Sequence, residues 1–312
     1  MKNVTIVLAL AAACGLAGAL RASQTDFGSA SVAAPWATVP NSPRDTAMGG
    51  ALVADPEGLE ALDANPAGLA RMEGQQASLA HNAWFQNMAL ETARYGAALP
   101  SDGGLGLGLN YFNFGSVDTY TVDPNTGMPV AGGTVNPYGI EAQAGYGQRV
   151  GSLSLGASLK YLSQDLDGYT ASAWGGDLGA VWETGFSGLN LGLAVQNLGS
   201  QLGGYALPLQ AQVGAAEQVA VRGSDQATLA LSGTFPSADS QADGVGVGGE
   251  YLFSRALALR LGYKYEGNAQ QGGSAGLSAG LGLHWRWAEV DYAFQSLGDL
   301  GNSNQIGLGA KF

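Results

Sequence analysis

Cysteine, histidine and charged residues are all scarce in this chain. Cys14 is the only cysteine, so no disulfide can form within the chain and an exported domain must rely on its core alone. Charged residues make up 12% of the sequence, about half of the ~25% that is usual in soluble domains. A surface with so little charge is easier to explain in lipid than in water.

The few charges also exclude whole classes of function. The 13 Lys and Arg stand against 25 Asp and Glu, a net charge of -12, whereas nucleic-acid binding needs clustered cations. His81 and His284 are the only imidazoles, and neither stands in a motif with a nucleophile. The sequence contains no metal-ligand spacing and no phosphate-binding glycine loop. We therefore expect no enzyme, no metal, no cofactor and no nucleic-acid partner.

Long apolar runs are absent except at the start of the chain. Lys2 precedes a nearly uncharged run from Val4 to Leu20, which ends in small residues before Ala22. This pattern predicts a secretory signal peptide over residues 1–22, with which Cys14 is lost on cleavage. A retained helical anchor is the alternative, but the run falls short of the ~20 apolar residues that a membrane helix needs.

Glycine, by contrast, is abundant, and the sequence alternates with period two from about residue 76. The 50 glycines stand among plentiful aliphatic and aromatic residues, which argues against disorder. In each segment one face is apolar and the other small or polar, as where Leu153 and Leu155 alternate with Ser154 and Gly156. Strands are predicted over residues 76–84, 88–99, 104–114, 138–149, 152–163, 171–183, 188–198, 207–219, 226–235, 244–253, 256–265, 275–286, 288–296 and 304–312.

The length of these segments and the joins between them favour a membrane barrel. Most match the ~9–11 residues of a tilted strand that crosses a bilayer, whereas strands of soluble proteins usually run ~5–6 residues. Tight joins alternate with longer loops, of which 115–137 is the longest. A soluble sandwich is the alternative, but its solvent faces would need more charge than is present. We therefore predict an all-β fold, an antiparallel transmembrane β-barrel of about 14 strands, with both termini in the periplasm because the strand count is even.

Residues 43–70 lack this alternation and carry two short motifs. The first is Ala47-Met48-Gly49-Gly50-Ala51 and the second is Asn65-Pro66-Ala67-Gly68-Leu69. Together they resemble the start of PorV/PorQ-type proteins within the FadL-like outer-membrane superfamily. The resemblance implies a fourteen-stranded barrel whose amino-terminal portion forms a hatch in the lumen. The chain departs from the pattern between the motifs, where relatives often place paired Asp residues and this chain has Asp55-Pro56-Glu57-Gly58.

We expect the two motifs to form an internal plug, because a barrel of this size would otherwise leave an open aqueous lumen. A surface turn is the alternative. Gly49 and Gly50 permit close backbone approach or positive φ, and Pro66 biases Asn65 away from helix. The predicted plug motif comprises Met48, Gly49, Gly50, Asn65, Pro66, Ala67 and Gly68. The predicted domains are the signal peptide at 1–22, an N-terminal periplasmic or lumenal plug segment at 23–75 and the barrel at 76–312.

Charged residues gather on the lumen-facing register of the later strands. They are Glu250, Arg260, Lys264, His284, Arg286, Glu289 and Asp291. They either line a polar passage or a docking site for the plug, or form the ion-pair network that fills many barrel interiors, and the second interpretation is favoured. Apolar Phe112 and Leu252 on the lumen side mark a candidate ligand pocket. The terminal strand ends in Phe312, which resembles the signal read by the bacterial barrel-assembly machinery.

These features lead to an outer-membrane location in a bacterial cell and to competing functions. The first hypothesis is FadL-like passive transport of a hydrophobic small molecule, which leaves through a gap in the wall or past a moving plug. The second is a PorV-like docking or shuttle component for secreted proteins, as in type IX secretion, and the third is a structural barrel. The expected partners are outer-membrane lipid, the barrel-assembly machinery, and either a hydrophobic ligand or a secreted protein.

Overall fold

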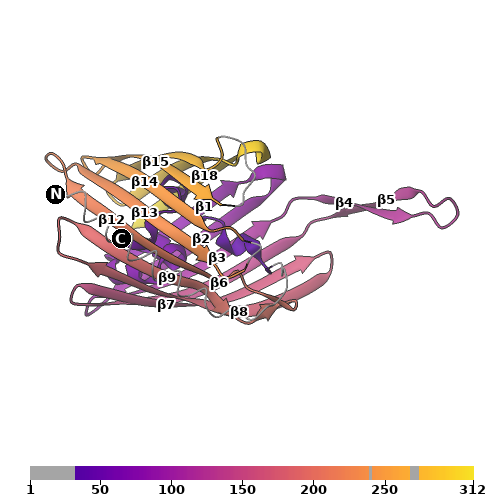
Figure 1. Cartoon of the computed structure of the whole chain (residues 1–312), viewed down its shortest axis with the longest axis horizontal. Helices are drawn as coiled ribbons and strands as arrows, with labels where there is room; N and C mark the ends of the chain where they lie inside the picture. Colours follow the sequence, from indigo (N-terminus) through magenta and orange to yellow (C-terminus); the bar gives the residue numbers. More distant parts are fainter. Residues whose placement is uncertain (1–31, 239–240, 268–273) are drawn as a thin grey trace.

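The computed structural model describes residues 32–238, 241–267 and 274–312, and it confirms a closed antiparallel barrel of fourteen strands (Figure 1). Each strand pairs with its neighbours in the wall, and β1 closes the ring against β18. The wall strands are β1 (Gln75–Ala83), β2 (Ala89–Leu99), β3 (Gly103–Asn113), β6 (Tyr138–Val150), β7 (Leu153–Leu166), β8 (Tyr169–Glu183), β9 (Leu189–Gly199), β12 (Gln210–Ala220), β13 (Gln226–Pro236), β14 (Gly244–Phe253), β15 (Leu257–Glu266), β16 (Leu277–Trp285), β17 (Ala288–Ser296) and β18 (Asn302–Lys311).

The alternation in the sequence places apolar side chains on the outside of the wall. On β3, for example, Leu105, Leu107 and Leu109 are exposed, while the glycines between them face inward. The same stripe continues around the barrel through Leu79, Leu159, Leu178, Leu229, Leu261, Leu281 and Leu308. A soluble domain rarely leaves so large an apolar surface uncovered, whereas a bilayer requires it. The arrangement predicted for the two faces of each strand is therefore the observed one.

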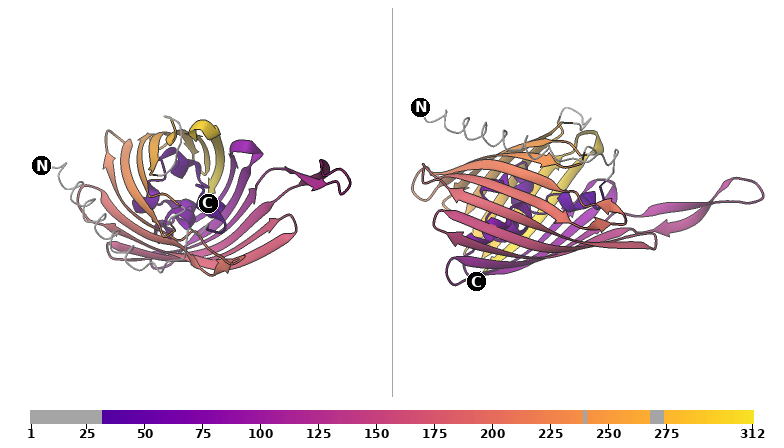
Figure 2. Two further views of the ribbon diagram at one scale, coloured as in Figure 1. Left: turned by 45° about the vertical axis from the view of Figure 1, so that its right-hand side comes forward. Right: turned by 60° about the horizontal axis from the view of Figure 1, so that its bottom comes forward.

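The two ends of the barrel differ in their connections. At one end, called here the short-turn end, strands are joined by tight links such as Gly151 and Ser152, or Ser254 to Ala256. At the other, the long-loop end, a two-stranded hairpin of β4 (Val117–Val122) and β5 (Pro129–Val135) projects well beyond the barrel (Figures 1 and 2). A smaller pair, β10 (Gln201–Leu202) and β11 (Tyr205–Ala206), and the short helices η6 (Phe85–Asn87) and η7 (Gly298–Leu300) also lie in these loops. The C-terminus lies at the short-turn end (Figure 1), whereas the predicted signal peptide lies outside the described residues.

Residues 33–72, called here the lumenal segment, run inside the barrel (Figure 2). This segment folds into short helices: η2 (Pro35–Thr38), α2 (Pro43–Ala47), η3 (Leu52–Ala54), η4 (Gly58–Glu60), α3 (Ala61–Ala64) and η5 (Pro66–Arg71). Ser42 caps α2 by accepting a hydrogen bond from the Asp45 amide at 3.4 Å, and Pro43 fits its first turn. No helix among the described residues is long and apolar enough to cross a bilayer.

Close backbone contact between the wall and the lumenal segment depends on inward-facing glycines. A Cβ atom built on Gly248 would lie 2.4 Å from the Met48 carbonyl oxygen, and one built on Gly156 would lie 2.2 Å from the carbonyl carbon of Pro66. Neither distance leaves room for a side chain. Inward-facing glycines of the strands are thus positions at which the backbone of the lumenal segment lies directly against the wall.

Neighbouring glycines on β14 provide a direct test of this packing. We expect Gly248→Ala to destabilise the folded protein by about 1–3 kcal/mol, because the added methyl group overlaps the Met48 backbone. Gly249→Ala is the matched control, since its Cβ would point to the outer face and make only ordinary contacts, with Leu229 Cδ2 at 3.6 Å and the Thr228 carbonyl oxygen at 4.0 Å. Thermal unfolding in detergent, followed by circular dichroism, compares the two. Equal melting temperatures would contradict close packing at Gly248.

Candidate functional site: the barrel interior

Asn65 ties the second motif to the barrel wall. Its side chain is fully buried, and its Nδ2 donates to the carbonyl oxygens of Val53 at 2.7 Å, Ala180 at 3.2 Å and Leu193 at 3.2 Å. Its Oδ1 accepts a hydrogen bond from the Ala67 amide at 3.1 Å and so caps η5. One amide therefore joins the lumenal segment to β8 and β9.

The first motif forms the turn that follows α2. Met48 is fully buried, while Gly49 and Gly50 have φ values of 66° and 72°, a region that glycine adopts without strain. A Cβ on Gly49 would lie 2.8 Å from the Tyr263 backbone. In the second motif, a Cβ on Gly68 would lie 2.6 Å from the Pro56 carbonyl oxygen. All seven predicted plug-motif residues thus lie inside the barrel, and whether they close it is a functional question taken up below.

Arg44 joins the predicted charge network to the lumenal segment. This buried guanidinium contacts Asp55 at 2.9 Å and Glu250 on β14 at 3.2 Å, and it lies 3.7 Å from Glu60. Arg260 on β15 contacts the same Glu250 at 2.5 Å and also pairs with Asp291 on β17. The network predicted on the wall is therefore completed by charges that the lumenal segment brings to it.

Two predicted members of that network lie elsewhere. Lys264 is at the long-loop end of β15, where its Nζ lies 2.8 Å from Glu266. Arg286 follows the last residue of β16 and is exposed in the turn at the short-turn end. The strand ends at Trp285, one residue earlier than predicted. The alternation that assigned Arg286 to the lumen therefore does not extend to it.

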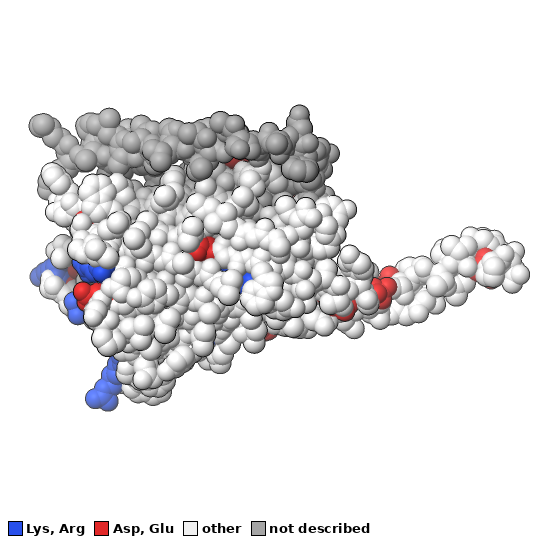
Figure 3. All heavy atoms as spheres, turned by 90° about the horizontal axis from the view of Figure 1, so that it is seen from below, with Lys and Arg blue, Asp and Glu red and all other residues white. Residues whose placement is uncertain are grey.

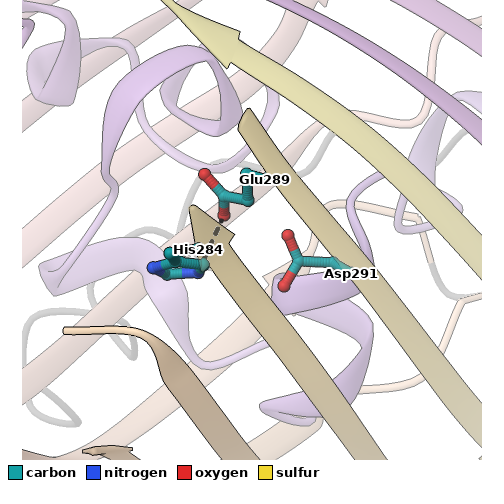
Figure 4. Close-up of side chains that lie close together, drawn as sticks. All are labelled: His284, Glu289 and Asp291. Atoms are coloured by element: carbon teal, nitrogen blue, oxygen red, sulfur yellow. Dashed lines mark ion pairs between the residues drawn. The ribbon is translucent and has the colours of Figure 1, made fainter. Parts of the chain in front are cut away.

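The structure brings His284, Glu289 and Asp291 together at the short-turn end of β16 and β17 (Figure 4). Each offers one ligand atom, and these atoms lie within 4.8 Å of one another. His284 Nε2 is 3.2 Å from a Glu289 oxygen, and Lys311 Nζ is 3.7 Å from the other oxygen of Glu289. Arg260 also pairs with Asp291, so positive side chains already neutralise both carboxylates. We therefore interpret the cluster as part of the ion network.

Two further ion pairs hold the interior together and were missed by the sequence analysis. Arg94 on β2 lies 2.6 Å from Asp63 of the lumenal segment, and Lys160 on β7 lies 2.9 Å from Asp177 on β8. Burial opposes ionisation of Asp63, but the nearby Arg94 and Lys160 outweigh it and hold the pKa of Asp63 below its ordinary value. Each of the two wall cations stands among small and polar residues on an inward face, a signal that could have identified them.

An apolar cluster lies inside the barrel at the long-loop end. Trp36 of η2 is 4% exposed and stacks on Phe112 with ring centroids 6.1 Å apart, while Trp84 meets Phe112 edge-on at 5.7 Å. The cluster also contains Ala33, Ala34, Leu90, Leu162, Ala173, Leu202 and Leu207, with Met88 and Phe114 beside it. Leu252 lies at the opposite end of the barrel, one residue before the end of β14. Phe112 and Leu252 therefore do not share a pocket, contrary to the prediction.

Polar cavities lie on either side of α2. A cavity of about 390 Å³ opens toward the long-loop end, and its lining includes Gln196, Gln210, Gln212 and Asp45. A smaller one of about 140 Å³ lies toward the short-turn end. The lining of the second includes Arg44, Glu57, Glu60, Glu250, Arg260 and His284. Because Asp45 borders the first cavity and Arg44 the second, α2 stands between them.

Glu60 lines the smaller cavity together with other carboxylates and with cations. Burial raises its pKa from the ordinary 4.5 to about 7, although Arg44 and a hydrogen bond from the Ser42 hydroxyl oppose the rise. The folded state therefore holds this proton more tightly than the unfolded chain. The resulting stabilisation is full below about pH 4.5 and is lost as the pH rises through 7.

We expect Glu60→Gln to remove this pH dependence. Because the amide stays neutral, the variant should be more stable than the parent at pH 8, by up to about 3 kcal/mol, and similar to it at pH 4.5. Melting temperatures measured in detergent from pH 4.5 to 8 check the expectation. A parent whose stability rises over this interval while that of the variant does not would contradict the assignment.

Asn65→Asp is the sharpest change to the anchor of the lumenal segment. It keeps the shape but replaces three donated hydrogen bonds by an acceptor that faces carbonyl oxygens, and each lost bond costs about 1 kcal/mol or more. We expect faster amide hydrogen exchange in residues 52–70 and a higher single-channel conductance in planar bilayers. Asn113→Asp is the control, since Asn113 Oδ1 acts as an acceptor to the Gly115 amide. Unchanged amide hydrogen exchange in Asn65→Asp would contradict the role of Asn65 as an anchor.

Comparisons with known proteins agree with this architecture. No protein-family model and no curated protein sequence matches the chain. Among solved structures, the toluene transporter TbuX of Ralstonia pickettii is similar with a TM-score of 0.60 and 16% identity, covering 86% of this chain and 98% of that one.

Two further solved structures are similar. The toluene transporter TodX of Pseudomonas putida has a TM-score of 0.60 and 15% identity, with coverage of 86% and 96%. A FadL homologue of Pseudomonas aeruginosa has a TM-score of 0.56 and 13% identity, with coverage of 87% and 98%. At such identities the likeness establishes the fold alone, and the chain therefore shares the barrel fold of the FadL-like transporters.

Proposed function

We propose that the chain is an outer-membrane channel for passive transport of small hydrophobic molecules. The observation that carries the proposal is the aromatic cluster around Phe112, inside the barrel at the end where the long loops emerge. An apolar, ring-lined interior region is suited to bind a hydrophobic ligand by burial of surface. The likeness of the fold to two toluene transporters supports the same function.

The outer wall supports the location in an outer membrane. The exposed apolar stripes cover the strands, and rings such as Tyr111, Trp182 and Trp285 lie near their ends. With the hairpin of β4 and β5 on the cell exterior, the short-turn end and Phe312 face the periplasm. Phe312, which is 73% exposed there, is then placed to serve as the assembly signal.

Trp36 fills the place that a ligand would take. Its indole is enclosed by Phe112 and Leu162, and its only polar atom donates to Gln164 Oε1 at 3.3 Å. A small aromatic ligand offers the same apolar surface and loses no hydrogen bond on entry. Displacement of Trp36 would therefore exchange one buried ring for another and free η2 to move.

The onward route leads past the lumenal segment. Strand pairing is continuous between all neighbours in the wall, with a register shift only between Gly176 and Leu178 on β8. Inside, α2 separates the two polar cavities and is held by Arg44 through ion pairs rather than by an apolar seal. Of the two exits considered, movement of the lumenal segment is thus favoured over a gap in the wall.

The alternative functions gain less support. The similar structures described above are two toluene transporters and a FadL homologue, so a PorV-like docking role for secreted proteins has no observation in its favour. A merely structural barrel leaves unexplained why apolar rings gather inside the long-loop end.

Toluene binding tests the proposal. We expect the purified protein in mild detergent to bind radiolabelled toluene above a detergent blank. Trp36→Ala should bind toluene about tenfold more tightly, because it removes a competing ring whose burial contributes roughly 1.5–3 kcal/mol. Phe112→Gln should abolish binding, since an amide enters the apolar site. Trp285→Ala is the control, because Trp285 is 74% exposed on the outer surface. Binding no greater than the blank in both the parent and Trp36→Ala would end the proposal.

A further inference from the structure

Exposed cations of the barrel gather at one end. Among the described residues, the exposed Lys and Arg are Arg222, Arg255, Arg286 and Lys311, and all four lie at the short-turn end. Figure 3 shows blue side chains gathered at the end away from the hairpin and red ones along the hairpin. The long-loop end instead carries Asp118, Asp123, Asp167, Asp243 and Asp299. Among the described residues, exposed cations are therefore confined to the short-turn end, where exposed acids such as Glu73 and Asp102 also lie.

Three of these cations occupy consecutive turns of the wall. Arg222 lies between β12 and β13, Arg255 between β14 and β15, and Arg286 between β16 and β17. Within the described part of the chain, none of the three forms an ion pair. Asp225, the nearest acid in sequence to Arg222, instead accepts hydrogen bonds from the Ser254 amide at 2.7 Å and the Tyr251 hydroxyl at 3.2 Å. We call these three residues the arginine arc.

The backbone at two positions of the arc disfavours arginine. Arg255 and Arg286 have φ values of 56° and 52°, a left-handed backbone conformation that residues other than Gly, Asn and Asp rarely adopt. Some short turns of the same barrel use glycine there, as at Gly151 and Gly223 with φ of 64° and 61°, and the turn between β2 and β3 uses the small or polar residues Ser101 and Asp102. In a chain so rich in glycine, an arginine held in this conformation points to a role for its side chain.

Aromatic rings place the arc at the depth of lipid headgroups. Trp285 and Trp287 flank Arg286 and are 74% and 62% exposed, and Phe253 precedes the turn of Arg255. Exposed rings of this kind prefer the boundary between hydrocarbon and headgroups. The guanidinium groups beside them stand at the level of lipid phosphates, to which arginine can donate two parallel hydrogen bonds.

We propose that the arginine arc binds the phosphate groups of anionic phospholipids in the leaflet at the short-turn end. The proposal rests on the membrane location proposed above. It makes the protein's lipid preference one-sided, because the acidic long-loop rim has no exposed cation among the described residues. Attraction to an anionic surface contributes roughly a fivefold change in affinity for each arginine and weakens with salt.

Lipid retention measures this preference. The full-length protein is inserted into nanodiscs of equimolar phosphatidylglycerol and phosphatidylcholine, then extracted into mild detergent, and the retained lipids are counted by native mass spectrometry. We expect enrichment of phosphatidylglycerol in the parent, and its loss in R222Q/R255Q/R286Q and at high salt. Arg149→Gln is the matched control, because Arg149 at the same rim is engaged by Glu183 at 2.5 Å and should retain the enrichment.

A glycine variant separates lipid binding from folding. R255G/R286G relieves two left-handed arginines, so its melting temperature should equal or exceed that of the parent while its enrichment of phosphatidylglycerol falls. Enrichment of phosphatidylglycerol that persists in this variant or in the triple glutamine variant overturns the proposal that the arginine arc binds lipid. Failure of the parent to enter nanodiscs overturns the membrane location itself, whereas loss of toluene binding with intact lipid enrichment affects only the transport function.

Discussion

The structure depends on the absence of side chains where the lumenal segment meets the wall. Backbone atoms of residues 47–67 approach the strands so closely that a Cβ on Gly156 or Gly262 would overlap them. Because the wall offers only small side chains there, short helices with irregular turns can lie flat against it. The high glycine content, the interior position of this segment and the burial of its apolar residues all follow from that single steric condition.

Ion pairs then fix the position of the lumenal segment against the wall. Arg44 of the lumenal segment pairs with Glu250, and Arg94 of the wall pairs with Asp63 of the lumenal segment. Each pair joins two elements that are distant in sequence and lie in a partly polar interior. Pairs of this kind specify one arrangement, but they exchange for water more readily than an apolar core does.

The interior is divided by polarity along the barrel axis. Rings around Phe112 form the apolar region at the long-loop end, and polar cavities follow on both sides of α2. The free energy of a hydrophobic solute would therefore fall when it enters the apolar region and rise when it moves into the polar cavities. Under the proposed transport function, this asymmetry favours capture at the long-loop end. Outside the lumen, the two ends also differ in charge: acidic residues lie in the loops of the long-loop end, and the arginine arc lies at the short-turn end.

The sequence alone determined the strands, their number and which face of each is apolar, because a period of two over about ten residues is a local property of the chain. Gly49, Gly50 and Asn65 were identified as motif residues through a family resemblance of two short motifs, not through periodicity. Only the tertiary structure decided which residues meet across the lumen. Arg44 and Asp63 belong to a segment without regular periodicity, so their partners Glu250 and Arg94 could not be inferred from spacing. Phe112 and Leu252 face the same lumen but lie at opposite ends of it, since their separation depends on strand direction rather than on alternation.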